Sequence, residues 1–339
     1  MIAVSNLDAT ETTGGGSSLL DVRGLSVSYR SDRGLVSALD DVSFAVGTSE
    51  VVGLVGESGC GKSTVAGAVL GLLPRSAQVH GSVRFAGEEL VAARASVLRH
   101  LRGNRIATIV QDPTTSLDPT FSVGQQIAET VRAHAQVTRS VAKQRALEVL
   151  AEVGIPDPRT RYDDPPHRLS GGMRQRVVIA AALVNDPALI IADEPTTALD
   201  VTIQAQILAL LLRLRDDRGT AIMLISHDLA VVASVCDRVV TMYAGQIAER
   251  APTGSLFAEP GHPYTGALLE ALPGSGHAPG ELPVIAGTVP DLAGPLPGCR
   301  FATRCRHRFE PCDTRPPMAT VAPHHDVACW LRVDTAEHP

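Results

Sequence analysis

The sequence lacks an apolar run long enough to cross a membrane. Its longest runs, Val177–Val184 and Ile207–Leu212, fall well short of the about 20 residues that a spanning helix requires. The segment Met1–Ser18 contains no lysine, no arginine and no continuous apolar stretch, so it does not have the composition of a signal peptide. We therefore expect a soluble protein that faces the cytosol.

The chain also lacks an excess of positive charge. Its 30 lysines and arginines are outnumbered by 36 aspartates and glutamates, which gives a net charge of −6 over 339 residues. Because nucleic acids are bound largely through their phosphates, we expect no nucleic-acid partner for an acidic chain. A hydrophobic content of 44% excludes a disordered or fibrous chain. The sequence contains neither an internal repeat nor a coiled-coil heptad pattern.

Composition divides the chain into three parts. Residues 1–18 are dominated toward their end by glycine, serine and threonine and are predicted to form a flexible leader. Residues 19–251 alternate between strand-like and helix-like segments and form the body. Residues 252–339 hold 14 of the 23 prolines. Because proline breaks regular elements, we expect a separate, loop-rich C-terminal extension there.

The body is predicted to be an α/β domain. Segments 20–29 and 38–46 favour half-buried antiparallel strands, whereas 50–55, 188–192 and 220–225 are apolar runs of strand length. The predicted helices are marked by apolar residues at helical spacing: Val65, Val69 and Leu73; Val141, Leu147, Leu150 and Val153; and Ile203, Ile207, Leu210, Leu211 and Leu214. Apolar strands that alternate with helices indicate a parallel sheet covered on both faces.

A phosphate-binding loop is predicted where the strand at 50–55 ends. Residues 56–63 read Gly-Glu-Ser-Gly-Cys-Gly-Lys-Ser, which fits G-x-x-x-x-G-K-[ST] between a strand and a helix. The glycines let backbone N–H groups surround phosphate oxygens, and the helix adds the positive end of its dipole. Lys62 would offset charge on the β- and γ-phosphates, and the Ser63 hydroxyl would bind Mg²⁺. The alternative is a glycine-rich turn that happens to carry a lysine.

Two carboxylates follow the apolar run at 188–192. Asp193 and Glu194 leave a buried parallel strand and therefore lie at the carboxyl edge of the sheet, where ligands of α/β proteins bind. Asp193 would hold the hydrated Mg²⁺, and Glu194 would polarise the attacking water. Such a pair at a strand end is common on protein surfaces, and only its combination with the phosphate loop makes it a candidate site.

Three further features occur in a fixed order. Ser170-Gly171-Gly172 opens a helical pattern, and Gln111 and His227 each follow an apolar strand. Each has an ordinary alternative taken alone: a turn, a capped strand end, or a histidine at the edge of the core. All of them in this order, together with the phosphate loop, specify one class of protein.

From about Leu19 to its C-terminus the chain resembles the ATP-binding subunit of an ABC transporter. The resemblance implies a P-loop NTPase (RecA-like) core with an antiparallel β subdomain and a helical subdomain at about 98–176. It implies Glu194, His227, Lys62 and Gln111 as catalytic residues, and Ser63, Gln111 and Asp193 around Mg²⁺. The residues that it places at ATP are Tyr29 (stacked on adenine), Gly56, Glu57, Ser58, Gly59, Cys60, Gly61, Lys62, Ser63, Thr64, Gln111, Ser170, Gly171, Gly172 and Asp200.

Within that family the chain is similar to the peptide/nickel importer group. Three segments carry the similarity: Gln111–Pro119, Gly261–Leu269 and Gly298–Cys329. Met173 stands where the broad family usually has glutamine, and Thr48-Ser49-Glu50 replaces a Pro-Gly-Glu turn. Similar peptide transporters also carry Met-Arg-Gln-Arg, so we expect an active site.

The resemblance implies a role and an assembly. The chain would hydrolyse ATP to power import of peptides, or alternatively of nickel or another small solute, from the cytoplasmic side of the cell membrane. Its expected partners are a second ATP-binding subunit, usually a paralogue, two membrane permeases and an extracytoplasmic substrate-binding protein. Ser170 and Gly172 would complete the ATP site of the second subunit. ATP then bridges two chains, and hydrolysis releases the bridge.

Four cysteines gather in the last 41 residues: Cys299, Cys305, Cys312 and Cys329. In a reducing compartment such a set is more typical of a metal site than of disulfides. Four thiolates suit zinc or an iron–sulfur cluster, and the loose spacing fits [4Fe–4S] better than the close pairs of structural zinc. Zinc with a nearby histidine and no metal at all remain the alternatives.

Cys60 lies in the phosphate loop at a helix start, an environment that lowers the pKa of a thiol. The alternative is that it fills space and contributes only its backbone N–H. In either case we expect its alkylation to block ATP binding.

Other functional classes fit the sequence less well. A non-transport ABC ATPase that acts on DNA or ribosomes would carry a coiled-coil insert, tandem cassettes or basic stretches. A P-loop GTPase would carry N-K-x-D and lack Ser170-Gly171-Gly172. Neither set of features is present in this sequence.

Overall fold

Strands and helices alternate through most of the chain, as expected for an α/β protein. This computed structural model describes residues 18–32, 34–197, 199–272, 285–294 and 296–333, so the predicted leader lies outside the described residues except for Ser18. The strands are β1 (Leu20–Ser31), β2 (Gly34–Val46), β3 (Val51–Val55), β4 (Gln78–Phe85), β5 (Glu88–Glu89), β6 (Ile106–Ile109), β7 (Leu189–Asp193), β8 (Ala221–Ser226), β9 (Arg238–Tyr243), β10 (Gln246–Pro252), β11 (Ala319–Ala322) and β12 (His325–Val327). The helices are α1 (Lys62–Val69), α2 (Ala95–Leu101), α3 (Pro113–Ser116), α4 (Val123–His134), α5 (Arg139–Glu152), α6 (Pro158–Arg161), α7 (Gly171–Leu183), α8 (Val201–Arg218), α9 (Leu229–Val235), α10 (Thr253–Ala258) and α11 (Pro263–Glu270).

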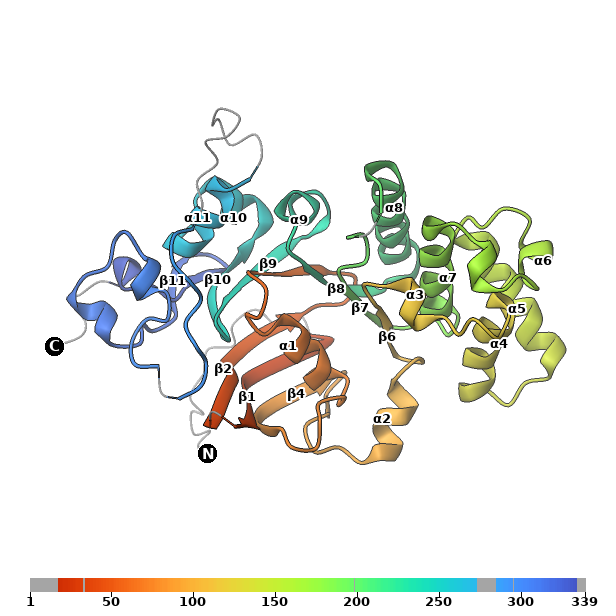
Figure 1. Ribbon diagram of the computed structural model, residues 1–339, viewed down its shortest axis with the longest axis horizontal. Helices are drawn as coiled ribbons and strands as arrows, with labels where there is room; N and C mark the ends of the chain where they lie inside the picture. Colours follow the sequence, from red (N-terminus) through yellow and green to blue (C-terminus); the bar gives the residue numbers. More distant parts are fainter. Residues whose placement is uncertain (1–17, 33, 198, 273–284, 295, 334–339) are drawn as a thin grey trace, which may run out of the picture.

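An eight-stranded sheet of the described residues runs along the molecule in the order β11-β12-β10-β9-β3-β8-β7-β6 (Figure 1). The strands from β9 to β6 pair in parallel, which confirms the predicted parallel core. In β3 all five residues are buried, because helices or the second sheet cover both of its faces. The carboxyl ends of β3, β6, β7 and β8 consequently meet at one edge.

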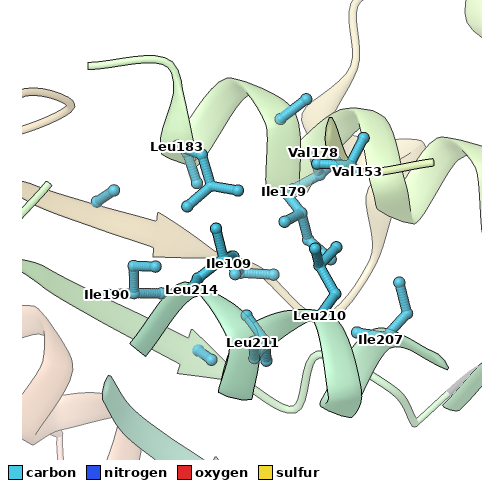
Figure 2. Packing of buried hydrophobic residues seen from close by; sticks show 14 of the residues in the cluster. Ile109, Val153, Val178, Ile179, Leu183, Ile190, Ile207, Leu210, Leu211 and Leu214 are labelled. Atoms are coloured by element: carbon cyan, nitrogen blue, oxygen red, sulfur yellow. The ribbon is translucent and has the colours of Figure 1, made fainter. Parts of the chain in front are cut away.

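Side chains of the parallel strands alternate between two apolar cores. Ile190 and Ala192 pack on the side of α7 and α8, whereas Leu189 and Ile191 pack on the side of α1 and the antiparallel strands. Figure 2 shows the first core, where Leu210, Leu211 and Leu214 of α8 approach Ile179 and Leu183 of α7 in the cluster that also contains Ile190 of β7.

A second sheet packs on the same side of the central sheet as α1. Its order is β2-β1-β4-β5, and β1 pairs antiparallel with β2 from Leu20–Val46 to Ser31–Gly34. The alternating segments therefore form antiparallel strands as predicted. In Figure 1 this sheet lies below the central one, with α1 beside it.

Two predicted helices differ in detail from the structure. The helix after the phosphate loop ends at Val69 rather than continuing to Leu73, because Gly71 takes a left-handed φ of +60°. In α5 the predicted face is partly wrong, since Val141 is 53% exposed. The buried residues of this helix are Ala142 and Ala146 together with Val149 and the predicted Leu150.

Helices α3 to α7 gather at the end of the molecule beyond β6 (Figure 1). The predicted insertion at about 98–176 contains α3 to α6 but ends inside α7, which continues to Leu183. It also contains β6, the edge strand of the central sheet. None of the helices in the described part of the chain is both long and apolar enough for a membrane span.

The C-terminal extension shares the central sheet. Strand β12 pairs antiparallel with β10 through Glu249–Val327 and Arg250–Asp326, and β11 pairs with β12. A small apolar core joins Phe301 of the extension to Tyr243 and Tyr264. The extension is therefore continuous with the body in structure, although its composition changes sharply at Pro252.

Candidate active site

The phosphate loop connects β3 to α1 as predicted. Gly56 has a φ of +147°, and a Cβ at this position would lie 2.2 Å from the carbonyl oxygen of Met242. Gly61 has a φ of +106°, and a Cβ there would lie 2.9 Å from the carbonyl oxygen of Ala38. Both positions require glycine because other residues rarely adopt this backbone and have no room for a side chain.

Lys62 opens α1 and is buried. Its ammonium group donates hydrogen bonds to the carbonyl oxygens of Gly56 at 2.7 Å and Glu57 at 3.0 Å. The loop thus holds its own cation at the start of the helix, where the helix dipole is also positive.

Asp193 ends β7 beside the loop. The Ser63 hydroxyl donates a hydrogen bond to its Oδ2 at 3.3 Å. Burial raises the pKa of Asp193, the neighbouring Glu194 raises it further, and Ser63 and Lys62 oppose both effects. A hydroxyl and a carboxylate oxygen this close are hard oxygen donors, which Mg²⁺ prefers. The residues predicted for Mg²⁺ therefore fit the ion by their chemistry.

Glu194 is the centre of a hydrogen-bonded group. Its Oε1 accepts from Nδ1 of His227 at 2.9 Å, and its Oε2 accepts from Nε2 of Gln111 and from the Thr197 hydroxyl, each at 3.0 Å. Its φ of +48° lies in the left-handed region, which costs a non-glycine residue about 1 kcal/mol or more.

The charge state of Glu194 follows from these contacts. Burial on its own would raise the pKa of Glu194, but the hydrogen bonds from His227 and Thr197 and the positive charge of Lys62 outweigh burial and lower it. The carboxylate is therefore ionised near neutral pH, as a group that orients or deprotonates water requires.

These side chains line one cavity of about 520 Å³, which we call the P-loop cavity. Its lining residues are Ala38, Ser58, Gly59, Gly61, Lys62, Ser63, Thr64, Gln111, Asp193, Glu194, Thr197 and His227. Ten of these twelve were predicted from the sequence. Ala38 and Thr197 were not predicted. The sequence does offer one indication for Thr197, because it is a hydroxyl residue three positions after Glu194, the carboxylate to which it donates.

Other predicted residues form a second cavity of about 340 Å³ that shares no lining residue with the first. We call it the Ser170 cavity; it is lined by Ser170, Gly171, Gly172, Met173, Arg176, Leu199, Asp200 and Ile203. Ser170 caps α7 by accepting from the Met173 N–H at 3.3 Å, and Asp200 caps α8 by accepting from the Ile203 N–H at 2.9 Å. Within one chain, Ser170, Gly171 and Gly172 therefore do not line the cavity of the phosphate loop.

Four predicted ATP contacts line neither cavity: Tyr29, Gly56, Glu57 and Cys60. Tyr29 sits in β1 opposite Val36 and packs in part against the core beneath it. Gly56 lies against the backbone of Met242 at the start of the loop. Glu57 contacts Arg304 of the C-terminal extension.

The expectation of a low pKa for Cys60 is wrong. The side chain is 1% exposed, and burial raises its pKa despite the nearby ammonium of Lys62. The loop encloses the thiol on its inner side, so the interpretation of Cys60 as a space-filling residue agrees better with the structure.

The four C-terminal cysteines are near one another but do not form a metal site. Burial first, and then the charges of Cys312, Cys329 and Cys305, raise the pKa of Cys299 to about 11. Yet among the described residues no group of three or more histidine, cysteine, aspartate or glutamate side chains is arranged to hold a metal ion. The donor chemistry fits an iron–sulfur cluster, whereas the placement of the thiols supports neither a cluster nor zinc.

Two family models match the chain. Residues 39–197 match "ABC transporter", and residues 248–312 match "Oligopeptide/dipeptide transporter, C-terminal region". The first match contains every lining residue of the P-loop cavity except Ala38 and His227. The second match covers the end of β10 and most of the C-terminal extension up to Cys312.

Curated relatives match over nearly the whole length. The chain is 50% identical to a probable peptide ABC transporter ATP-binding protein of Sinorhizobium fredii, over 92% of this chain and 94% of the relative. It is 46% identical to the dipeptide transport ATP-binding protein DppD of Bacillus subtilis, over 94% and 96%. It is 48% identical to the oligopeptide transport ATP-binding protein OppD of Mycobacterium tuberculosis, over 92% of this chain and 52% of that protein.

Solved structures resemble the fold. A dimeric, post-hydrolysis state of the ATP-binding cassette MJ0796 bound to ADP and Pi matches with a TM-score of 0.63 and 25% identity, over 69% of this chain and 98% of that one. CbiO1 from Clostridium perfringens, part of an ABC transporter complex, matches with a TM-score of 0.61 and 29% identity, over 71% and 91%.

Proposed function

This chain belongs to the peptide-transporter group of ABC ATP-binding proteins, and on that premise we propose that it binds and hydrolyses ATP in the P-loop cavity to power peptide import. One observation carries the proposal: Lys62, the Ser63–Asp193 pair and Glu194 converge on a single cavity. Its members supply a cation for phosphate, oxygen donors for Mg²⁺ and an ionised carboxylate for water.

Each group has a role that its position supports. The backbone N–H groups from Ser58 to Thr64 surround the phosphates, and Lys62 turns from its loop carbonyls to the β- and γ-phosphates. Ser63 and Asp193 hold Mg²⁺, which offsets phosphate charge when bound. Gln111, which donates a hydrogen bond to Glu194, would be the third residue near the ion.

Hydrolysis then requires one proton transfer. Glu194 orients a water and accepts a proton from it as the water oxygen bonds to the γ-phosphorus; the bond from that phosphorus to the β–γ bridging oxygen breaks, and ADP keeps the electron pair. His227 holds Glu194 at Oε1 and lines the same cavity, where it would steady the γ-phosphoryl group. Thr197 and Gln111 fix Oε2, so the carboxylate faces the cavity in one orientation.

The Ser170 cavity supports a two-subunit site. Helix α7 has thirteen residues, and the residues at its N-terminus line this cavity. The positive end of the helix dipole there would attract the oxygens of a γ-phosphate. Because the two cavities of one chain are separate, we propose that Ser170 and Gly172 contact ATP in the P-loop cavity of a second ATP-binding subunit. Two membrane permeases and an extracytoplasmic binding protein complete the proposed importer, which places this subunit at the cytoplasmic side of the membrane.

A finer part of the proposal concerns the four cysteines. Their number and their spacing in the sequence support a structural [4Fe–4S] cluster, whose formation would require the thiols to turn toward a common centre. Iron and acid-labile sulfide measured in anaerobically purified protein test this directly. Protein that binds ATP yet holds no iron removes the cluster, and stoichiometric zinc would replace it.

Uptake in cells tests the transported solute. Deletion of the gene is expected to abolish uptake of labelled di- and oligopeptides, and the wild-type gene restores it. The Lys62→Ala variant fails to restore uptake, whereas Arg306→Ala, a change at a side chain that is 66% exposed, restores it. Loss of radioactive nickel uptake with peptide uptake intact would overturn the peptide assignment and leave the ATPase assignment standing.

A further inference from the structure

Two residues of the C-terminal extension, Tyr264 and Arg304, form hydrogen bonds with Glu57 of the phosphate loop. Arg304 lies 247 positions later in the sequence and forms a forked pair with its carboxylate, Nη1 to Oε2 at 2.6 Å and Nη2 to Oε1 at 3.0 Å. Only 4% of the Arg304 side chain is exposed. A shielded, two-point contact of this kind is among the strongest that side chains make.

The surroundings fix the guanidinium of Arg304 in place. Its Nε donates to the carbonyl oxygen of Ala286 at 3.0 Å, and Nη2 donates to that of Ile285 at 3.1 Å. Nη1 also donates to the Tyr243 hydroxyl at 3.3 Å. All three nitrogens of the Arg304 guanidinium therefore have hydrogen-bond partners. These contacts hold the guanidinium in the orientation that faces Glu57.

A second contact holds the backbone of the same residue. The hydroxyl of Tyr264, which is fully buried in α11, accepts a hydrogen bond from the Glu57 N–H at 2.8 Å. In the following peptide group the Glu57 carbonyl oxygen accepts from the ammonium group of Lys62 at 3.0 Å. Side chain, N–H and carbonyl of Glu57 are thus held at once, two of them by residues C-terminal to β10.

We propose that this clamp, formed by Arg304 and Tyr264 on Glu57, sets the conformation of the phosphate loop and thereby its affinity for ATP. Arg304 and Tyr264 are positioning residues, since neither lines the P-loop cavity. The inference rests on the proposed function, in that ATP must bind at the loop. A loop already held in its binding conformation loses less entropy when phosphate arrives, so release of the clamp weakens binding.

The test compares two arginines of the same segment in the full-length chain. Arg304→Ala removes the clamp, and Arg306→Ala removes an exposed ion pair with Glu270 and serves as the matched control. With a fluorescent ATP analogue and Mg²⁺ as the probe, we expect the Kd to rise about tenfold for Arg304→Ala and less than about twofold for Arg306→Ala. In steady state the KM for ATP rises while kcat is retained, because the reacting groups are unchanged.

Two further variants separate positioning from folding. Tyr264→Phe removes only the hydroxyl and is expected to raise the Kd by about threefold with an unchanged thermal melt. In a double-mutant cycle, Glu57→Gln and Arg304→Ala together raise the Kd no more than Arg304→Ala alone. If Arg304→Ala or Tyr264→Phe melts like the wild type and binds the analogue as tightly, the clamp is refuted. If the wild type itself does not bind, the proposed function fails first.

Discussion

Replacement of Glu194 by glutamine tests the chemistry of the P-loop cavity most directly. The change keeps the shape of the side chain but removes its charge and its ability to accept a proton. The carboxylate now accepts from His227, Gln111 and Thr197 at 2.9–3.0 Å. An amide has a single oxygen acceptor, so at least one of these three donors must face an NH₂ group.

Loss of a positioned general base costs about 10²–10⁴ in rate, which corresponds to about 2.7–5.4 kcal/mol of transition-state stabilisation. We therefore expect kcat for Glu194→Gln to fall by at least a hundredfold. The Kd for ATP is expected to stay within about threefold, because Lys62 and the loop N–H groups make the phosphate contacts. ATP that binds without being cleaved would accumulate in a closed pair of subunits.

The assay is phosphate release by the assembled pair, with equilibrium binding of ATP measured in parallel. Glu194→Asp is the matched control, since it keeps the charge and shortens the side chain. The pKa of Glu194 is lowered, so the base form persists as pH falls and is lost only below the ordinary glutamate value of about 4.3. A Glu194→Gln enzyme with a wild-type kcat, or a wild-type rate that falls between pH 8 and 6 through this carboxyl, would refute the assignment.

Other predictions address the second cavity and the stability of the fold. Ser170→Ala is expected to leave ATP binding by the separate chain within about twofold but to lower hydrolysis by the assembled pair about a hundredfold; an equal loss in both would argue against a two-subunit site. Leu210→Ala, at a residue that is 2% exposed, is expected to lower the free energy of unfolding by about 2–5 kcal/mol in urea titrations. Burial lowers the pKa of His262 to about 4, so the unfolded chain takes up its proton first as pH falls below about 6.5. Stability should then drop by up to about 3 kcal/mol between pH 6.5 and 4, and His262→Asn, which keeps an acceptor for the Tyr264 N–H, should remove that part of the pH dependence.

The sequence was most informative where a local pattern fully determines the structure. Strands β3, β7 and β8 were predicted because continuous apolar runs suit strands that are buried on both faces. The phosphate loop was predicted because two glycines and a lysine satisfy a backbone requirement that few other sequences meet. Strand β12 has only three residues, His325–Val327, in a proline-rich segment, and its pairing with β10 depends on a contact that no local pattern indicates.

The same limit applies to the site. Asp193, Glu194 and His227 could be predicted because each follows a strand whose carboxyl end reaches the same edge of the sheet. Arg304 could not, because it is separated from Glu57 by 247 positions and no local pattern links the two residues. The pKa of Cys60 could not be judged from the sequence, because a helix start and Lys62 favour ionisation of the thiol, whereas burial, which the sequence does not show, opposes it more strongly.

A short segment links the two cavities within one chain. Glu194 and Thr197 line the P-loop cavity, whereas Leu199 and Asp200 line the Ser170 cavity and lead into α8. Thr197 bonds the carboxylate that orients water in the proposed mechanism, and Asp200 caps α8 beside the proposed subunit contact. In the proposed two-subunit site, the groups that act on ATP and those that face the second subunit are therefore separated by only a few residues of the chain.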